Sequence, residues 1–252
     1  MLVRSWNLYH GNTSPPGRAS FLEEMVRLAS ADSPDILCLQ EVPAWALDRL
    51  AAWSGMTAVA DLAQRPTLGP FPSTPELGRR LTALNPGLLR SAFSGQGNAL
   101  LTRLDVLGRW RCVLNPRGFR RRLRVDAVTR LAWAKERRVS QAARLRLPDG
   151  RTAIVANLHA TSGDVRITRA EVERAAAFAV GLTGPGEPVV LAGDFNTAPE
   201  LGAYGFDAAG SGIDHVLARG LPAGEQRAWP EERRRRDEKL LSDHAPVERE
   251  VG

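Results

Sequence analysis

The 252-residue sequence predicts an α/β fold, and three observations support this prediction. Short apolar runs that end in polar side chains, such as 188–192, have the composition of buried strands. Between these runs lie segments whose apolar residues recur at helical spacing, such as 166–182. Neither an internal repeat nor a change in composition marks a second domain, and the length suits one substantial core. We therefore expect a single domain over 1–252.

The first helix is expected to lie between strands at 2–6 and 35–39. Ser20 and Glu23 form a capping-box signature, so the helix is predicted to begin at Ser20. Pro34 is predicted to stop it before the second strand begins.

The next two helices are separated by a loop. A helix is expected over 44–52, closed by Gly55. The stretch 64–75 is rich in Pro, Gly, Ser and Thr and is predicted to be a loop. A third helix is expected to begin at Thr74 and to run to about Leu84.

The second half of the chain predicts a hairpin followed by a helix and a strand. Residues 139–158 alternate as a hairpin whose turn is Pro-Asp-Gly at 148–150. The helix over 166–182 turns Ile167 and Phe178 inward, and the strand 188–192 follows it.

Polar side chains occur where the predicted strands end. They are Asn7; Gln40 and Glu41; Asn157 and His159; Asp194 and Asn196; Asp214 and His215; and Asp243 and His244. Strand ends that gather at one edge of a sheet commonly build a site, so we expect these side chains to converge. Because side chains alternate along an extended segment, Asp194 and Asn196 can point to the same side. Carboxylates and amides with few histidines are typical of a hard-cation site rather than a zinc site.

In their order, these motifs resemble those of the endonuclease/exonuclease/phosphatase superfamily of metal-dependent phosphohydrolases, which includes pancreatic-type deoxyribonucleases. The matching segments are Trp6-Asn7, Gln40-Glu41, Gly97-Asn98-Ala99-Leu100-Leu101, Asn157-Leu158-His159, Gly193-Asp194-Phe195-Asn196, Ile213-Asp214 and Ser242-Asp243-His244. The resemblance extends over nearly the whole chain. It implies a four-layer α/β/β/α sandwich, in which two mixed β-sheets pack face to face and helices flank them.

The resemblance also implies a metal site and a water-activating group. Glu41 is expected to be the principal ligand of Mg²⁺ or Mn²⁺, with Asn7 and Asp243 beside it. Mg²⁺ keeps several waters and needs only one or two carboxylates, so this sparse set is adequate. Asp194 is expected to orient and deprotonate the attacking water, helped by Asn196.

The remaining roles concern the phosphoryl group and the substrate. His244, polarised by Asp214, is expected to contact the phosphoryl group. His159 is expected to contact a non-bridging oxygen or to assist the leaving group. Four residues are assigned to substrate binding: Asn157, Asn98, Arg117 and Arg138. Of these, Asn98 is expected to support the site through hydrogen bonds, with direct contact to substrate as the alternative. Three others are given structural roles: Trp6 as packing beneath the site, and His10 and His215 as ordinary buried or edge histidines.

Positive charge is concentrated in one segment, which we treat as a basic insertion at about 103–138. This segment holds twelve Arg or Lys against three Asp or Glu, whereas the whole chain has a formal net charge of +6. One interpretation is a surface for a polyanion, most simply a nucleic acid. The other is a solvated face in a protein that uses Arg in place of Lys. The sequence does not decide between them.

Other properties restrict the class of protein. No run of about 18 apolar residues predicts a membrane span, and the strand that begins at Leu2 leaves no room for a leader peptide. Cys38 and Cys112 are isolated, which predicts neither a disulfide framework nor a zinc site. We expect a reduced, cytoplasmic setting and assume a monomer.

The favoured hypothesis is an Mg²⁺- or Mn²⁺-dependent nuclease that cleaves phosphodiester bonds in DNA or RNA. The alternative is a phosphodiesterase or phosphatase for a small-molecule or lipid phosphate, in which the arginines would converge on one pocket. A non-catalytic phosphate-binding relative ranks last, because Glu41, Asp194 and His244 are all present.

Overall fold

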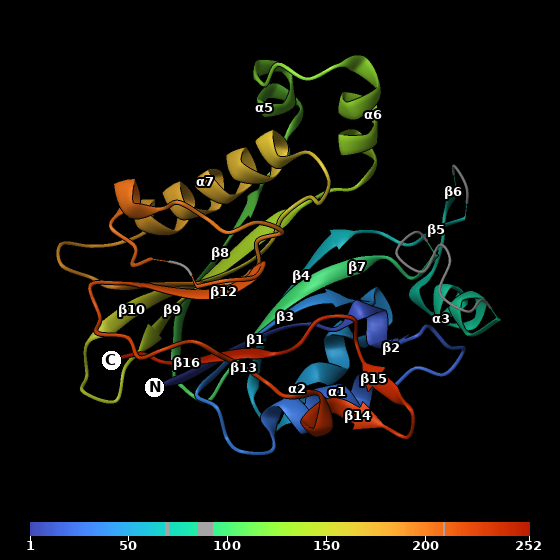
Figure 1. Cartoon of the computed structure of the whole chain (residues 1–252), viewed down its shortest axis with the longest axis horizontal. Coiled ribbons are helices and arrows are strands. Elements are labelled where there is room, and N and C mark those ends of the chain that lie inside the picture. The colour runs from blue at the N-terminus through green and yellow to red at the C-terminus, as the bar shows by residue number, and fades with distance from the viewer. Residues whose placement is uncertain (69–70, 85–92, 209) are drawn as a thin grey trace.

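The computed structural model describes residues 1–68, 71–84, 93–208 and 210–252, and within them two β-sheets pack face to face (Figure 1). The first sheet has the strand order β13 (Arg227–Ala228), β16 (Val247–Glu250), β1 (Leu2–Asn7), β3 (Ile36–Val42), β7 (Gln96–Thr102) and β4 (Thr57–Gln64). The second has the order β12 (Asp214–Arg219), β11 (Val189–Asp194), β10 (Thr152–His159), β9 (Val139–Arg146) and β8 (Val106–Val113).

Helices cover the outer face of each sheet. The first sheet carries α1 (Leu22–Ser30), the 3₁₀ helix η2 (Ala44–Arg49) and α2 (Leu50–Ser54), and the second carries α7 (Val165–Gly181). Apolar side chains of both sheets, including Val3 and Val155, fill the space between them. The four-layer α/β/β/α sandwich expected from the family resemblance is confirmed.

Shorter elements border the sandwich. They are η1 (Tyr9–Gly11), β2 (Thr13–Ser14), β5 (Thr67–Leu68), β6 (Phe71–Pro72), α3 (Pro75–Leu84), α5 (Arg117–Arg122), α6 (Ala127–Lys135), η3 (Gly202–Tyr204), η4 (Glu231–Arg234), β14 (Arg235–Arg236) and β15 (Lys239–Leu241). Of these, β14, β15 and β2 form a small third sheet, and β5 pairs with β6.

Several local predictions are confirmed, and two are wrong. The hairpin, the third helix and the long amphipathic helix occur as β9–β10, α3 and α7. The capping box is not formed, because α1 begins at Leu22 and its N-cap residue is Phe21. The Phe21 N–H instead donates to the Gly11 carbonyl, so a tertiary contact sets the start of this helix. The predicted loop 64–75 contains the short β5–β6 hairpin.

The basic segment 103–138 divides into two structurally different parts. Its first part forms β8, an edge strand of the second sheet. Residues 114–138 form a lobe that contains α5 and α6 and projects from the sandwich (Figure 1). The lobe packs against the start of α7 through Val125, Trp133 and Ile167. Only this second part is therefore an addition to the layered core.

Two further sequence expectations concern the membrane and the cysteines. Among the described residues, no helix is long and apolar enough to cross a lipid bilayer. Cys38 and Cys112 are both free thiols, and burial raises the pKa of Cys38 to about 12.

A buried arginine joins three segments at one side of the first sheet. Arg4 in β1 has no solvent exposure, and its guanidinium makes two hydrogen bonds to Asp32, at 2.7 and 2.8 Å. Arg4 Nε donates to Glu248 of β16 at 3.0 Å, and the guanidinium lies over the Trp229 ring. These contacts hold the pKa of Asp32 well below its usual range. Burial raises the pKa of Glu248, but hydrogen bonds from Trp229 and Arg4 outweigh it, so that pKa is also lowered.

Replacing Arg4→Met is expected to lower the free energy of unfolding by about 3 kcal/mol, because it removes the buried charge that pairs with Asp32 and Glu248 and leaves them only the partly exposed Arg233. The folded-state pKa values of Asp32 and Glu248 are depressed, so their stabilisation is present above the ordinary carboxyl pKa near ~4 and is lost as the pH falls. Urea unfolding at pH 6 and pH 3 should therefore show that the free energy of unfolding falls less between these two pH values in the variant than in the wild type.

The matched control for this prediction is Arg27→Met, which breaks an exposed ion pair with Glu23 on α1. It should change stability by less than ~1 kcal/mol. If the free energy of unfolding falls equally on acidification in the wild type and in Arg4→Met, the stabilising role of the Arg4 ion pairs is contradicted.

Candidate active site

Two parallel strand pairs place the predicted polar residues at one edge of the sandwich. In the first sheet, β1 and β3 are parallel, with Asn7 opposite Gln40. In the second, β10 and β11 are parallel, with His159 opposite Asp194, and Asp194 lies opposite Asp214 of the antiparallel β12. Because the two sheets face each other, the carboxyl ends of these strands meet.

The backbone adopts uncommon conformations at this edge. Glu41, Asn196 and Ser242 have φ values of 52°, 51° and 63°, in the left-handed region that non-glycine residues seldom occupy. Such positions persist only where the surrounding structure enforces them, and they concentrate at functional sites. Ser242 Oγ donates to the Asn7 carbonyl at 2.7 Å, which ties the loop that carries Asp243 and His244 to β1.

Gly193 allows the two central strands of the second sheet to approach closely. Its φ is 142°, and a Cβ there would lie 2.0 Å from the Leu158 carbonyl oxygen. No other residue fits this position. The close approach leaves Asp194 Oδ2 only 3.5 Å from His159 Nε2.

Asp194 is almost fully buried and is held by hydrogen bonds on both oxygens. Asn7 Nδ2 donates to Oδ2 at 3.0 Å, and the Asn196 N–H donates to Oδ1 at 2.9 Å. Burial, together with the negative charge of Asp214, raises the pKa of Asp194 to about 7. Asp194 is therefore a carboxyl group that exchanges its proton near neutral pH.

His244 and Asp214 form a hydrogen-bonded pair beside Asp194. His244 Nδ1 lies 2.8 Å from Asp214 Oδ2, and His244 Nε2 lies 3.9 Å from Asp194 Oδ2. Burial disfavours the charged imidazole, but the hydrogen bond and charge of Asp214 outweigh this and raise the pKa of His244 to about 9. Trp6 Nε1 donates to the His244 carbonyl at 2.9 Å, so Trp6 supports this loop from beneath, as predicted.

Glu41 faces Asp194 from the first sheet and is surrounded by positive or polar groups. Asn7 Nδ2 lies 3.3 Å from Glu41 Oε1, and His10 Nε2 lies 3.1 Å from Oε2. Burial raises the pKa of Glu41, but the charge of His10 with its hydrogen bond, and the charge of Arg138, hold it well below its usual range. Glu41 is therefore ionised.

His10 is a site residue that sequence analysis assigned to a structural role. It lies in the 3₁₀ turn directly after β1, and its own φ of 54° turns the ring toward Glu41. Its position three residues after the strand-end Asn7 was the only signal in the sequence. His215, by contrast, is buried against Phe195, with Nε2 3.1 Å from the Gly212 carbonyl oxygen, which fits the structural role expected for it.

Arg138 and His159 form the opposite wall of the site. Arg138 Nη1 lies 2.9 Å from the ring nitrogens of His159, and its Nη2 donates to Glu136 at 2.6 Å. Burial and the Arg138 charge lower the pKa of His159 well below its ordinary value, so the imidazole is neutral. His159 can then offer one N–H as a hydrogen-bond donor but cannot serve as a charged acid.

Three of the four expected substrate contacts lie elsewhere. Asn157 is fully buried between the sheets, where its amide donates to the Leu39 and Ala99 carbonyls at 3.0 Å. Asn98 is 3% exposed and donates to a main-chain carbonyl of β9. Arg117 is exposed at the start of α5, in the lobe. Of the four, only Arg138 reaches the site; the two asparagines support it from inside.

The donor set on the first-sheet side suits a hard divalent cation. Glu41 and Asp243 supply carboxylate oxygens and Asn7 an amide oxygen, which are ligands that Mg²⁺ and Mn²⁺ prefer. Burial, and repulsion from Glu41, raise the pKa of Asp243, and a bound cation would favour its charged form.

A second group of possible ligands fits such a cation less well. One ligand atom from each of Asp194, Asp214 and His244 lies within 4.8 Å of the others. The raised pKa of His244 protonates the ring, and its Nδ1 is engaged by Asp214. A protonated imidazole repels a cation, so Glu41, Asn7 and Asp243 suit a divalent metal better than this group does.

Comparison with known families agrees with this geometry. Residues 5–244 match the endonuclease/exonuclease/phosphatase family. The chain belongs to this family. Members of the family are phosphohydrolases, and the family generally uses a divalent metal. No curated protein shows significant sequence similarity to the chain.

Solved structures of family members share the fold at low sequence identity. An endonuclease/exonuclease/phosphatase from Beutenbergia cavernae is 15% identical, with a TM-score of 0.69, covering 100% of this chain and 71% of its own. A mannosyl-6-phosphatase from Bacteroides thetaiotaomicron is 17% identical, with a TM-score of 0.62, covering 100% and 99%. TDP2 from Caenorhabditis elegans is 16% identical, with a TM-score of 0.62, covering 99% and 73%. These similarities concern the fold and leave the substrate open.

The substitution Asn157→Ala is expected to destabilise the fold by about 3 kcal/mol, because it removes three buried hydrogen bonds, to the Leu39 and Ala99 carbonyls and from the Gln40 amide. Asn98→Ala removes one such bond and should cost about 1–2 kcal/mol. Chemical denaturation gives both values. In folded protein neither change should raise KM. A raised KM with unchanged stability would instead support the substrate contact that was predicted from the sequence.

Proposed function

We propose that the protein is a divalent-metal-dependent phosphodiesterase that cleaves nucleic acid. The observation that carries the proposal is the convergence of Glu41 from one sheet with Asp194 and the His244–Asp214 pair from the other side of the cleft. An ionised carboxylate, a proton-exchanging carboxyl group and a carboxylate-bound histidine are the groups that phosphodiester hydrolysis needs.

The metal supplies the charge that this chemistry requires. A Mg²⁺ or Mn²⁺ ion bound by Glu41, Asn7 and Asp243 would neutralise negative charge on the phosphoryl oxygens. Phosphoryl transfer depends mainly on positioning and on such electrostatic stabilisation.

The protein's own groups then orient water and substrate. Asp194 orients the attacking water and accepts its proton, while Asn7 and the Asn196 N–H keep the carboxylate in place. His244 uses Nε2 to donate a hydrogen bond to a phosphoryl oxygen, because its Nδ1 is held by Asp214. On the opposite wall, the neutral His159 donates to a second oxygen or to the leaving group.

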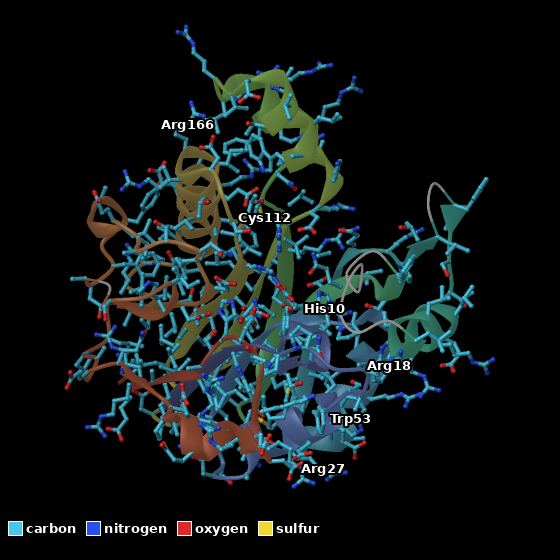
Figure 2. The ribbon with its side chains drawn as sticks, turned by 45° about the vertical axis from the view of Figure 1, so that its right-hand side comes forward. His10, Arg18, Arg27, Trp53, Cys112 and Arg166 are labelled. Carbon is cyan, nitrogen blue, oxygen red and sulfur yellow. The ribbon has the colours of Figure 1, made fainter. Side chains whose placement is uncertain are left out.

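The distribution of charge on the lobe favours a polymeric substrate. Its arginines are spread over an exposed surface rather than gathered at one point, and the side chains extend in several directions (Figure 2). The exposed basic residues of the lobe are Arg117, Arg121, Arg122, Arg124, Arg130, Lys135 and Arg137. A dispersed basic surface favours contact with the backbone of a nucleic acid.

A small-molecule or lipid phosphate is the second candidate substrate. It is favoured by a separate cluster of two arginines, Arg49 and Arg79, in a cavity beside His10. Convergence on one cavity is typical of recognition of a compact phosphate ester.

Substitution of the reacting groups should abolish turnover without unfolding the protein. Asp194→Asn and His244→Gln are each expected to lower kcat/KM at least ~10²-fold, since they remove the water-orienting carboxylate and the phosphoryl contact. Glu41→Gln should shift the Mg²⁺ titration to higher concentration, and EDTA should stop the reaction. The matched control is Asp105→Asn, which changes an exposed carboxylate on the edge of the second sheet and should leave kcat/KM unchanged.

The measurement is hydrolysis of plasmid DNA, single-stranded DNA, RNA, bis-p-nitrophenyl phosphate, and inositol and lipid phosphates. Metal-dependent cleavage of nucleic acid supports the first candidate, and turnover confined to small or lipid phosphates supports the second. Unchanged activity in Asp194→Asn and His244→Gln would contradict the proposed mechanism.

The double substitution Arg121→Glu with Arg122→Glu tests the lobe. Cleavage of DNA at low salt should fall by ~10-fold or more, and the slope of log KM against log salt should decrease by about 1–2, because two phosphate contacts are lost. Turnover of bis-p-nitrophenyl phosphate should not change. Arg235→Glu with Arg236→Glu, in β14, should leave both substrates unaffected; a lobe variant that behaves like this control would refute nucleic-acid contact there.

A further inference from the structure

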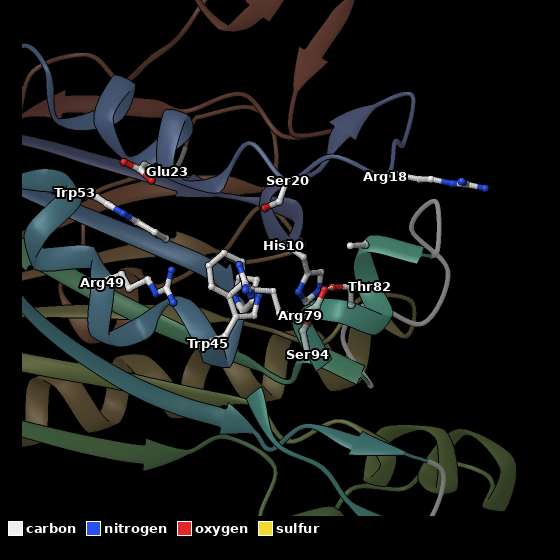
Figure 3. A pocket seen from close by; sticks show the side chains of 12 residues that line it. His10, Arg18, Ser20, Glu23, Trp45, Arg49, Trp53, Arg79, Thr82 and Ser94 are labelled. Carbon is white, nitrogen blue, oxygen red and sulfur yellow. Dashed lines mark hydrogen bonds between the residues drawn. The ribbon is translucent and has the colours of Figure 1, made fainter. Parts of the chain in front are cut away.

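A cavity of about 290 Å³ lies beside the metal-binding side of the site (Figure 3). Its walls come from η1, α1, η2, α2 and α3, and from the segments before α1 and β7. Trp45 and Trp53 form one side of it, and Arg49 and Arg79 lie beside them, while Arg18 stands at the rim. None of these residues has a role in the proposed mechanism.

The tryptophans hold the two arginines in the cavity. The rings of Trp45 and Trp53 pack edge to face, with centroids 6.1 Å apart and an angle of 74°. The guanidinium groups of Arg49 and Arg79 lie 5.5 and 5.8 Å from the centre of the Trp45 ring. Stacking of this kind restricts a guanidinium while leaving its N–H groups available.

The positive charge in the cavity is only partly compensated. Arg79 pairs with Glu76 at 2.7 Å, on the exposed surface of α3. Glu23 also lines the cavity, and it pairs with Arg27 at 2.8 Å. Within the described part of the chain, no carboxylate lies at ion-pair distance from Arg49. A pre-positioned guanidinium without a carboxylate partner is a ready site for an anionic group.

His10 provides a second, independent indication of a ligand. Its side chain lines the cavity and is 8% exposed, and Nε2 is directed to Glu41 at 3.1 Å. The other ring nitrogen, Nδ1, is buried and has no hydrogen-bond partner among the described residues. Buried polar atoms without a partner are uncommon, and a ligand or water in the cavity would satisfy this one. The cavity is thus one side chain away from Glu41.

We propose that this cavity is a subsite for a second phosphate group of the substrate, adjacent to the phosphate that is cleaved. Arg49 and Arg79 bind the phosphate oxygens, and His10 Nδ1 contacts the phosphate or its neighbouring hydroxyl. The proposal deepens the phosphodiesterase assignment and rests on it. The second phosphate is either the next phosphodiester of a nucleic acid or another phosphate on a small molecule.

The test compares substrates that differ by one phosphate. Thymidylyl-thymidine is compared with its 5′- and 3′-phosphorylated forms, and an inositol monophosphate with a bisphosphate. We expect one phosphorylated form to have a kcat/KM ~10-fold or more above its parent, mainly through KM. Arg49→Gln and Arg79→Gln should each remove most of that preference. Arg151→Gln, an exposed arginine in the turn between β9 and β10, outside the cavity, should retain it.

The two substrate pairs distinguish the source of the phosphate. A preference confined to dinucleotides supports a nucleic-acid subsite, and one confined to the inositol pair supports a small-molecule subsite. Absence of a preference in the wild type, its persistence in both cavity variants, or its loss in Arg151→Gln would overturn the proposal.

A binding measurement separates this proposal from the proposed activity. Tryptophan fluorescence is titrated with thymidine 3′,5′-bisphosphate and with pyrophosphate, in EDTA, on the Asp194→Asn protein. Saturable binding that is ~10-fold weaker with Arg49→Gln, but not with Arg151→Gln, supports the subsite. It does so even if no substrate is hydrolysed, an outcome in which the proposed activity fails. Binding that does not depend on Arg49 overturns the subsite even where hydrolysis is normal.

Discussion

The hydrogen bond from the Asn7 amide to the Asp194 carboxylate, 3.0 Å long, joins the two sheets where the site forms. Asn7 ends β1 and Asp194 ends β11, so each comes from a different sheet. Within each sheet, parallel neighbours then bring Glu41 beside Asn7 and His159 beside Asp194. A shift of one residue in any of these strands would turn its side chains to the opposite face. The whole constellation therefore depends on the register of four strands.

Burial between the ends of the two sheets disfavours charged side chains, and the neighbours of each group determine whether its pKa is raised or lowered. Glu41 keeps its charge because His10 and two other cationic or polar neighbours surround it. Asp194 lies deeper and faces Asp214, which raises its pKa. Neighbouring carboxyl groups whose pKa values are pushed apart are typical of sites where one holds a charge and the other moves a proton. His244 stays charged because Asp214 is bonded to it.

Positive charge lies on both sides of this acidic cleft, in two different forms. The lobe of 114–138 extends the second sheet and carries its arginines in solvent. The cavity beside His10 lies among helices of the first sheet and holds Arg49 and Arg79 against Trp45. Mobile surface charges attract a polyanion over long distances, whereas stacked guanidiniums select a phosphate at a defined position. A substrate with several phosphates can use both.

Local patterns in the sequence determined the hairpin at 139–158, the helix at 166–182 and the residue types at the strand ends, because each depends on near neighbours. The family resemblance extended this to four layers and to the positions of Glu41 and Asp194. Tertiary structure alone decided that Asn157 is buried between the sheets, whereas His159, two residues later, lies beside Asp194 in the site. It also decided that His10 meets Glu41. The physical reason is that these outcomes depend on how one sheet is placed against the other, and on a turn outside any periodic pattern, neither of which is encoded by residues adjacent in the chain.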